Sequence, residues 1–256
     1  DKKDTLHHLM LEDVRRDTTK TFSYFYLGLF KYFEQDYEKS TKYFIKYSES
    51  NPKDINPLLF LGKINFLQSN WLDAIFYFYR ALKINPNNLD ANLYLAKALI
   101  QIEDYDEAIK ILKYILKDNK DNYDLIFSLG ISNYFIRENE KAVEYLTQAL
   151  LLNSENYNTY YYLGLSYVEL DLNKKALDAY KKCIDINQNF ALAQYEIGKI
   201  YELILDDNKA IEHFELAKRN ISFDDLNYKL GISYYKNELF LKAMDPMKDY
   251  IINNLE

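Results

Sequence analysis

The sequence has few of the residues that usually build catalytic, metal or disulfide sites. Its 256 residues include 6 glycines, 4 prolines, 3 histidines and 1 cysteine. A single cysteine cannot form an intramolecular disulfide. With so few histidines there is neither a Cys–His pair for nucleophilic catalysis nor the ligand spacing of a zinc site. No glycine-rich phosphate-binding loop is present. We therefore expect no metal, no cofactor and no enzymatic activity.

The sequence also lacks a basic excess and long apolar runs. It carries 32 Lys and Arg against 39 Asp and Glu, a net charge of -7, and its lysines are spread along the chain. This distribution argues against nucleic acid as a partner. No apolar run reaches about 18 residues, so no membrane span is expected in this chain. Because the chain begins at Asp1 rather than Met, we expect that an upstream segment has been removed, and the location, cytoplasmic or exported, stays open.

The few glycines that are present follow a fixed period. All six lie on one series with intervals of 34 residues, shortened to 33 at the last step, and the one slot without glycine holds alanine. A constant period of this length is typical of repeat proteins, in which copies of one supersecondary unit stack. The small residues of the series are Gly28, Gly62, Ala96, Gly130, Gly164, Gly198 and Gly231.

Within each unit the apolar residues recur at spacings of three and four, which predicts helices rather than strands. Clusters of Asn, Asp and Pro separate these segments, as expected at helix ends. A glycine inside a helix costs about 1 kcal/mol relative to alanine, so the repeated glycine indicates a close approach of the second helix. The predicted first helices cover 21–34, 55–68, 89–102, 123–136, 157–170, 191–204 and 224–237, and the second helices cover 37–50, 71–84, 105–117, 139–152, 173–186, 207–219 and 240–253.

Further columns appear when each unit is numbered so that its small residue is position eight. Position seven is Leu or Ile, position 20 is Ala except for Ser40, and Pro52 and Pro86 follow the second helices of the first two units. The units then begin at residues 21, 55, 89, 123, 157, 191 and 224. Position 24 is always large, namely Phe44, Phe78, Leu112, Leu146, Tyr180, Phe214 and Met247.

This set of columns resembles the tetratricopeptide repeat (TPR), and the resemblance covers nearly the whole chain. It implies an all-α fold, a right-handed α-solenoid (superhelix) of seven antiparallel helix-pair repeats. The expected organisation is a TPR solenoid over residues 21–254, preceded by residues 1–20 as an N-terminal tether or a partial helix. Such a fold has a quasi-linear core in which each repeat contacts its neighbours.

The resemblance also implies where a partner binds, because the first helices of TPR superhelices line a concave face. Every repeat here carries an aromatic residue at position five or six, and aromatic rows on a hollow surface favour binding. We expect a non-catalytic protein–protein interaction scaffold or adaptor that holds an extended or helical partner segment. The predicted groove residues are Phe22, Phe25, Tyr26, Leu29, Phe60, Lys63, Tyr94, Lys97, Phe127, Ile131, Tyr161, Tyr162, Leu165, Tyr195, Lys199 and Tyr228.

Two features of the groove leave alternatives open. Residues at positions five and twelve can instead pack inward against the next repeat. Lys63, Lys97 and Lys199 share position nine, where they form either a sparse basic ladder for acidic side chains or ordinary solvated lysines. The carboxylate clamp by which co-chaperone TPR proteins hold the C-terminus of Hsp70 or Hsp90 is absent, because position five has no Lys and position nine has no Asn.

Other functions also fit the sequence. Pro246 lies inside the last predicted helix and is expected to kink or stop it, so the chain could be a structural subunit that associates with itself through the solenoid ends and the convex face. A small-molecule or lipid-binding solenoid is a further alternative. The identity of the partner does not follow from the residues.

Overall fold

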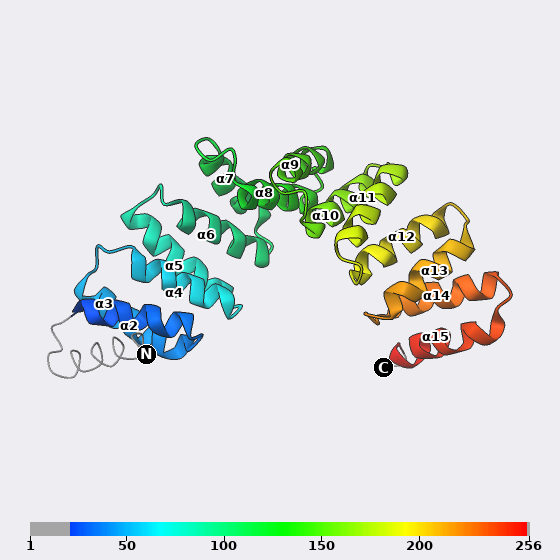
Figure 1. Ribbon diagram of the computed structural model, residues 1–256, viewed down its shortest axis with the longest axis horizontal. Coiled ribbons are helices and arrows are strands. Elements are labelled where there is room, and N and C mark those ends of the chain that lie inside the picture. Colours follow the sequence, from blue (N-terminus) through cyan, green and yellow to red (C-terminus); the bar gives the residue numbers. More distant parts are fainter. Residues whose placement is uncertain (1–20, 255–256) are drawn as a thin grey trace. The chain divides into compact units, whose positions relative to one another are not determined.

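The computed structural model describes residues 21–254, and within this range the chain folds into 14 α-helices without a strand (Figure 1). The predicted all-α class of helix-pair repeats is confirmed, whereas the tether or partial helix expected at 1–20 lies outside the described residues. The helices are α2 (Thr21–Phe33), α3 (Tyr37–Ser50), α4 (Asn56–Leu67), α5 (Trp71–Ile84), α6 (Leu89–Gln101), α7 (Tyr105–Leu116), α8 (Tyr123–Phe135), α9 (Asn139–Leu152), α10 (Tyr157–Glu169), α11 (Asn173–Ile186), α12 (Ala191–Leu203), α13 (Asp207–Lys218), α14 (Asp224–Lys236) and α15 (Phe240–Asn253).

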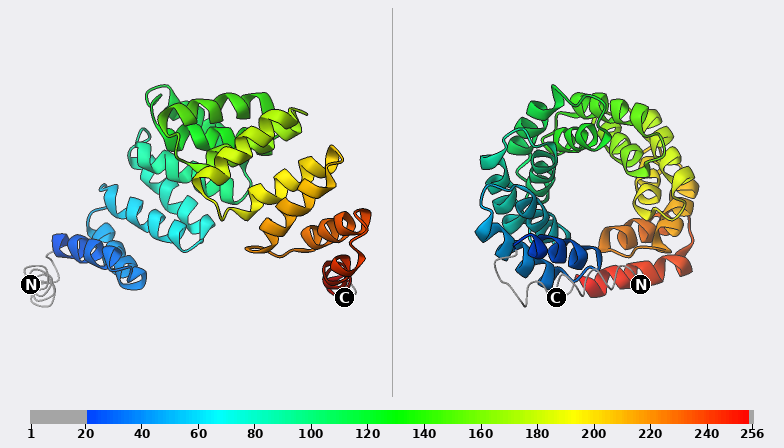
Figure 2. Two further views of the ribbon diagram at one scale, coloured as in Figure 1. Left: turned by 45° about the vertical axis from the view of Figure 1, so that its right-hand side comes forward. Right: turned by 60° about the vertical axis from the view of Figure 1, so that its left-hand side comes forward.

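The helices belong to two compact units, the first ending at Lys120 and the second beginning at Asp121. The first unit contains α2–α7 and the second α8–α15 (Figure 2). Within each unit every helix packs against the next one in the chain, and first helices also contact each other, as α4 does with α6 and α8 with α10. Each unit is therefore a stack of helix pairs. The expectation of one solenoid domain over residues 21–254 stays a prediction.

The periodic glycines let the two helices of a pair meet. A Cβ atom added to Gly62 would lie 2.5 Å from the ring of Phe78, and one added to Gly198 would lie 2.5 Å from the ring of Phe214. Both rings are fully buried. The large residue at position 24 thus rests directly on the backbone of position eight, which explains why a residue that weakens a helix recurs there.

The turn inside each helix pair contains a residue in the left-handed region that is not glycine. These residues all occupy position 15, and their φ angles lie between 58° and 63°. In each turn the next residue donates its N–H to the carbonyl five residues earlier, as Asp36 does to Lys31 at 2.9 Å. This is the Schellman arrangement that ends a helix. The residues are Gln35, Ser69, Glu103, Arg137, Asp171, Leu205 and Glu238.

The last helix does not stop at its proline. Helix α15 runs from Phe240 to Asn253 with Pro246 inside it, so of the kink or stop expected at this residue the stop does not occur. Proline removes one backbone donor and thereby one intrahelical hydrogen bond. Pro246 is buried, so its ring packs with the interior of the last repeat, and the helix resumes beyond it.

Candidate partner-binding surfaces

The predicted groove residues form two sets, one in each unit. The first unit holds those on α2, α4 and α6, and the second holds those on α8, α10, α12 and α14. Phe22, Tyr26 and Tyr228 are exposed, whereas Tyr195 is buried. The other 12 are half-buried: Phe25, Leu29, Phe60, Lys63, Tyr94, Lys97, Phe127, Ile131, Tyr161, Tyr162, Leu165 and Lys199.

Aromatic residues at position five turn inward, against position 24 of their own repeat. The ring centroid of Phe25 lies 5.7 Å from that of Phe44, and Tyr161 lies 6.0 Å from Tyr180. Inward packing, the alternative raised by the sequence, therefore describes these side chains in part. Each contributes one face of its ring to the core and leaves the remainder half-exposed.

Tyr195 departs furthest from the predicted open groove, because only 6% of its surface is exposed. Its ring packs against Phe214 at 5.8 Å and against Phe223, in the loop before α14, at 4.9 Å. Its hydroxyl donates a hydrogen bond to Asp225. Tyr195 therefore offers little surface to a partner.

Aromatic residues at position six connect neighbouring repeats. Phe60 stacks on Phe44 of the preceding repeat, with centroids 5.1 Å apart and ring planes 10° from parallel. Tyr94 stacks in the same way on Phe78, at 5.7 Å and 24°. In the first unit the ring at position 24 thus lies between two first helices, and the outer side of each position-six ring remains accessible.

The first unit presents an aromatic face, which we define as Phe22, Tyr26, Phe60, Lys63 and Tyr94. Phe22 is 68% exposed and Tyr26 is 51% exposed. Lys63 joins the next two rings, since its ammonium lies 6.0 Å from the centroid of Phe60 and 4.9 Å from that of Tyr94. These distances fall within the range of cation–π attraction.

Lys63 is nevertheless not a free cation. Its Nζ donates to Asp90 Oδ2 at 2.8 Å, which links α4 to α6. The ammonium of Lys97 lies 5.7 Å from the centroid of Tyr94. Lys199 in the second unit pairs with Glu196 at 2.9 Å. The lysines at position nine therefore interact largely with residues of this chain. This weakens the interpretation that they form a basic ladder for acidic side chains.

The second unit begins with an aromatic cluster around Tyr162. Its ring lies 6.2 Å from Phe127, 6.0 Å from Tyr134 and 6.2 Å from Phe135. Burial raises the pKa of the Tyr162 hydroxyl, and burial also raises that of Tyr161, so both stay protonated near neutral pH. The two neighbours can therefore donate hydrogen bonds from half-buried positions.

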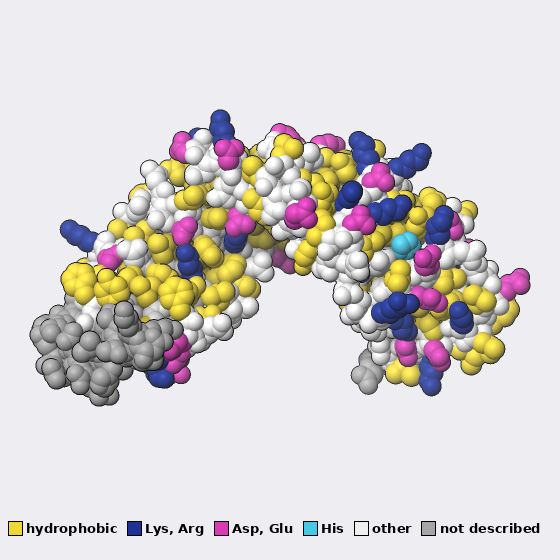
Figure 3. Space-filling model, viewed as in Figure 1, with side chains coloured by type: hydrophobic (Ala, Val, Ile, Leu, Met, Phe, Trp, Pro, Cys, Tyr) yellow, Lys and Arg dark blue, Asp and Glu magenta, His cyan; other side chains and the backbone are white. Residues whose placement is uncertain are grey.

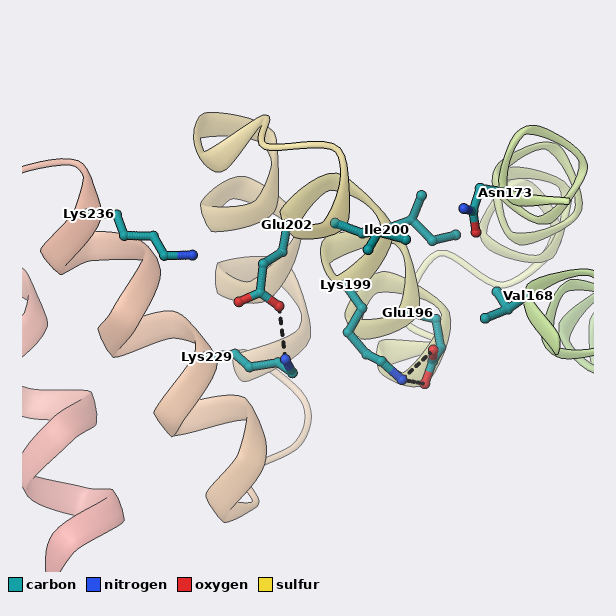
Figure 4. A pocket seen from close by; sticks show the side chains of 9 residues that line it. Val168, Asn173, Glu196, Lys199, Ile200, Glu202, Lys229 and Lys236 are labelled. Carbon is teal, nitrogen blue, oxygen red and sulfur yellow. Dashed lines mark hydrogen bonds and ion pairs between the residues drawn. The ribbon is translucent and has the colours of Figure 1, made fainter. Parts of the chain in front are cut away.

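Farther along the second unit, a pocket of about 450 Å³ opens beside α12 (Figure 4). Glu202 on α12 pairs with Lys229 on α14 at 2.8 Å, and Lys236 forms no ion pair with a residue that the structure describes. The pocket combines an apolar floor with three ammonium groups and two carboxylates. It is lined by Val168, Asn173, Glu196, Lys199, Ile200, Glu202, Leu203, Lys229 and Lys236.

Of the predicted groove residues only Lys199 lines this pocket. Lys229 and Lys236 are absent from the predicted groove residues, although both lie on a first helix and the TPR resemblance assigns first helices to the concave face. The signal for Lys229 is a change from aromatic to charged residues at position six between the fifth and the sixth repeat. A prediction from the aromatic residues alone does not detect that change.

Few residues in the described part of the chain could support metal binding, membrane insertion or nucleophilic catalysis. Across residues 21–254 no group of three His, Cys, Asp or Glu side chains could hold a metal ion. None of the described helices has the length and apolar character needed to cross a membrane. Burial raises the pKa of the Cys183 thiol to about 12, so it is not a nucleophile near neutral pH.

Comparisons with known proteins agree with the helix pairs. Tetratricopeptide repeat family models match residues 65–129 and 157–190. A crystal structure of MamA is 30% identical, covers 62% of this chain and 94% of its own, and superimposes with a TM-score of 0.57. The chain belongs to the tetratricopeptide repeat family. Among curated proteins none matches it significantly.

Two further TPR structures share the fold at lower identity. YrrB, described as a TPR protein with an unusual peptide-binding site, is 17% identical over 72% of this chain and 95% of its own, with a TM-score of 0.63. The pilF protein of Pseudomonas aeruginosa is 18% identical over 75% of this chain and 88% of its own, with a TM-score of 0.67. TPR proteins are generally protein-interaction scaffolds and typically non-catalytic, and their stacked repeats offer extended binding surfaces.

Proposed function

We propose that this TPR chain is a non-catalytic scaffold that binds a segment of a partner protein on its first-helix faces. The observation that carries the proposal is the exposure of Phe22 and Tyr26, at 68% and 51%, beside core columns that are fully buried. Neither residue belongs to the buried core, and large exposed aromatic side chains mark interaction surfaces.

The contacts of the aromatic face suggest what it binds. Rings on α2, α4 and α6 provide apolar area, and the lysine over Tyr94 is already neutralised by Asp90. Such a surface favours apolar anchor side chains of the partner rather than a strongly charged segment. The pocket beside α12 differs, because Lys236 adds a positive charge next to Ile200 and Leu203. It favours a carboxylate that neighbours an apolar side chain.

The non-catalytic part of the proposal rests on the described polar groups. His213 is half-buried, burial lowers the pKa of its imidazole, and its Nδ1 lies 2.7 Å from the side-chain oxygen of Gln194. Its ring stacks on Tyr201 with centroids 5.5 Å apart. The histidine is thus held between Gln194 and Tyr201, and none of its described contacts is a Ser, Thr or Cys side chain that it could activate.

The proposal can be tested by crosslinking followed by affinity measurement. A photo-reactive phenylalanine analogue that replaces Phe22 or Tyr26 should capture the partner in cells. With the captured segment as titrant, Phe22→Ala combined with Tyr26→Ala should weaken binding by about 2 kcal/mol or more, measured by calorimetry. This loss is expected because the two rings would be anchors at the centre of the interface.

The matched control removes two exposed rings from a second helix of the same unit. Phe76 and Tyr79 on α5 are 55% and 43% exposed, so Phe76→Ala with Tyr79→Ala deletes similar surface outside the aromatic face. Binding should then stay within about 0.5 kcal/mol of the original value. Equal losses for the two double variants, or no loss for the first, would place the partner elsewhere.

A further inference from the structure

In the fifth and sixth repeats the second helices carry apolar residues that pack on the next first helix. At position 21, Ile211 is only 8% exposed and clusters with Leu226 and Leu230 of α14. Leu177 and Ile184, at positions 21 and 28 of the fifth repeat, pack in the cluster that contains residues of α12. These columns are the apolar contacts by which one repeat stacks on the next.

Helix α15 keeps the same columns but leaves them uncovered by any described residue. Met244 at position 21 is 63% exposed and Ile251 at position 28 is 52% exposed. Phe240 at position 17 is 55% exposed, whereas that position is buried or half-buried in each of the other six repeats. Helix α15 thus exposes apolar residues at positions that are packed in the fifth and sixth repeats.

The exposed surface extends around the helix. We define the α15 end face as Phe240, Leu241, Met244, Ile251 and Ile252, of which Leu241 is 85% exposed. Contiguous apolar surface of this kind marks a protein contact. The face lies on a second helix, separate from the first-helix faces of the proposed function, so each can fail without the other.

Two charged residues border the α15 end face on one side. Asp245 and Lys248 are exposed, and neither forms an ion pair with a described side chain. At 100° per residue they lie about 60° apart on the helix, between Leu241 and Ile252 along its length. The border is therefore self-complementary, with one acidic and one basic residue flanked by apolar ones.

We infer that a second copy of this chain covers the α15 end face, with the two α15 helices antiparallel about a two-fold axis near residues 246–247. Such an axis places residue i opposite j and j opposite i. One register sets Asp245 opposite Lys248 of the other copy, twice, and sets Leu241 opposite Ile252 of the other copy, twice. The same alignment thus pairs the two charges and sets these two apolar residues against each other.

Sedimentation equilibrium of the 256-residue chain between about 1 and 200 µM tests this inference. The weight-average mass should rise from one chain to two. Leu241→Glu combined with Ile252→Glu should weaken the dimer at least tenfold, because glutamates would then face each other across the axis, twice. Both positions are exposed in the single chain, so the fold should persist, as circular dichroism can verify. Leu151→Glu, on α9 and 84% exposed, is the matched control and should leave the dimer unchanged.

A charge exchange tests the register. Asp245→Lys alone brings lysines together across the axis, and Lys248→Asp alone brings aspartates together, so each variant should dimerise about tenfold more weakly. An equimolar mixture of the two should recover dimers, because each lysine then meets an aspartate. A single-chain mass at every concentration, or dimers insensitive to the Glu variant, would overturn the inference. A mixture that dimerises no more strongly than either variant alone would overturn the antiparallel register.

Discussion

The first-helix faces of the two units use the same helix positions for different chemistry. Position six holds Phe60 and Tyr94 in the first unit, but Glu196 and Lys229 in the sixth and seventh repeats of the second. On the face shown in Figure 3, hydrophobic side chains dominate the first unit, whereas charged side chains are denser over the second. The helix-pair backbone is thus repeated along the chain, whereas the side chains on its surface differ from repeat to repeat.

This difference separates what the repeat requires from what it leaves free. Positions 8, 20 and 24 are constrained by contact, since the ring of Phe78 touches the backbone of Gly62 and that of Phe214 touches Gly198. Position six lies outside the contact between positions 8 and 24, and it accepts an aromatic, acidic or basic residue. Contacts with partners can therefore differ along the chain without a change of fold.

The largest expected effect comes from breaking the packing of one unit at a time. Gly62→Val in the first unit and Gly198→Val in the second should each cost about 3 kcal/mol, because a Cβ would lie 2.5 Å from a buried phenylalanine ring. Urea unfolding gives the total loss. Hydrogen exchange should show it concentrated in the altered unit, since repeats interact with their neighbours.

The control for these variants is Lys113→Val at an exposed site on α7, which measures the helix propensity of valine without a clash. It should cost about 0.5 kcal/mol. Equal loss of exchange protection in both units after either glycine substitution would show that the units unfold together, and the comparison between them would then not extend to stability.

A smaller effect should distinguish the buried Tyr195 of the second unit from the half-buried Tyr94 of the first. Tyr195→Phe removes the hydrogen bond to Asp225 and should cost about 1 kcal/mol. Tyr94→Phe should cost almost nothing, because no hydrogen bond joins its hydroxyl to a described residue. Thermal unfolding compares the two, and an equal cost would mean that the hydroxyl of Tyr94 has a role that its contacts do not show.

Most of the fold followed from the period of the small residues. The first helix predicted at 157–170 is observed as Tyr157–Glu169, and the second predicted at 173–186 is observed as Asn173–Ile186. Helix ends were placed about a residue late where the chain turns through the left-handed region. Residues such as Leu205 and Gln35 adopt it there without being glycine, so composition gave no sign of the turn.

The candidate surface was less predictable, because loop residues outside the helical period decide what is covered. Phe223 lies in the loop before α14 and packs 4.9 Å from Tyr195, and Phe190, directly before α12, packs 5.0 Å from Tyr161. Neither belongs to a column at positions five or six. A row of aromatic residues read from the helices alone therefore overstates how much ring surface is open to a partner.

The smallest effect concerns the ion pairs that link consecutive first helices, one in each unit. Lys63 pairs with Asp90 at 2.8 Å, and Lys229 pairs with Glu202 at the same distance. Lys63→Gln should cost about 0.3 kcal/mol, because the remaining carboxylate is 56% exposed and water solvates it. Lys229→Gln should cost more, about 0.8 kcal/mol, because Glu202 is only 21% exposed and would lose its partner.

Salt sharpens this last contrast. Unfolding at 0.05 M and 0.5 M NaCl should nearly abolish the cost of Lys63→Gln and leave part of the cost of Lys229→Gln, since a half-buried pair is screened less than an exposed one. Costs that fall equally with salt would mean that the pocket beside α12 is as open to water as the aromatic face.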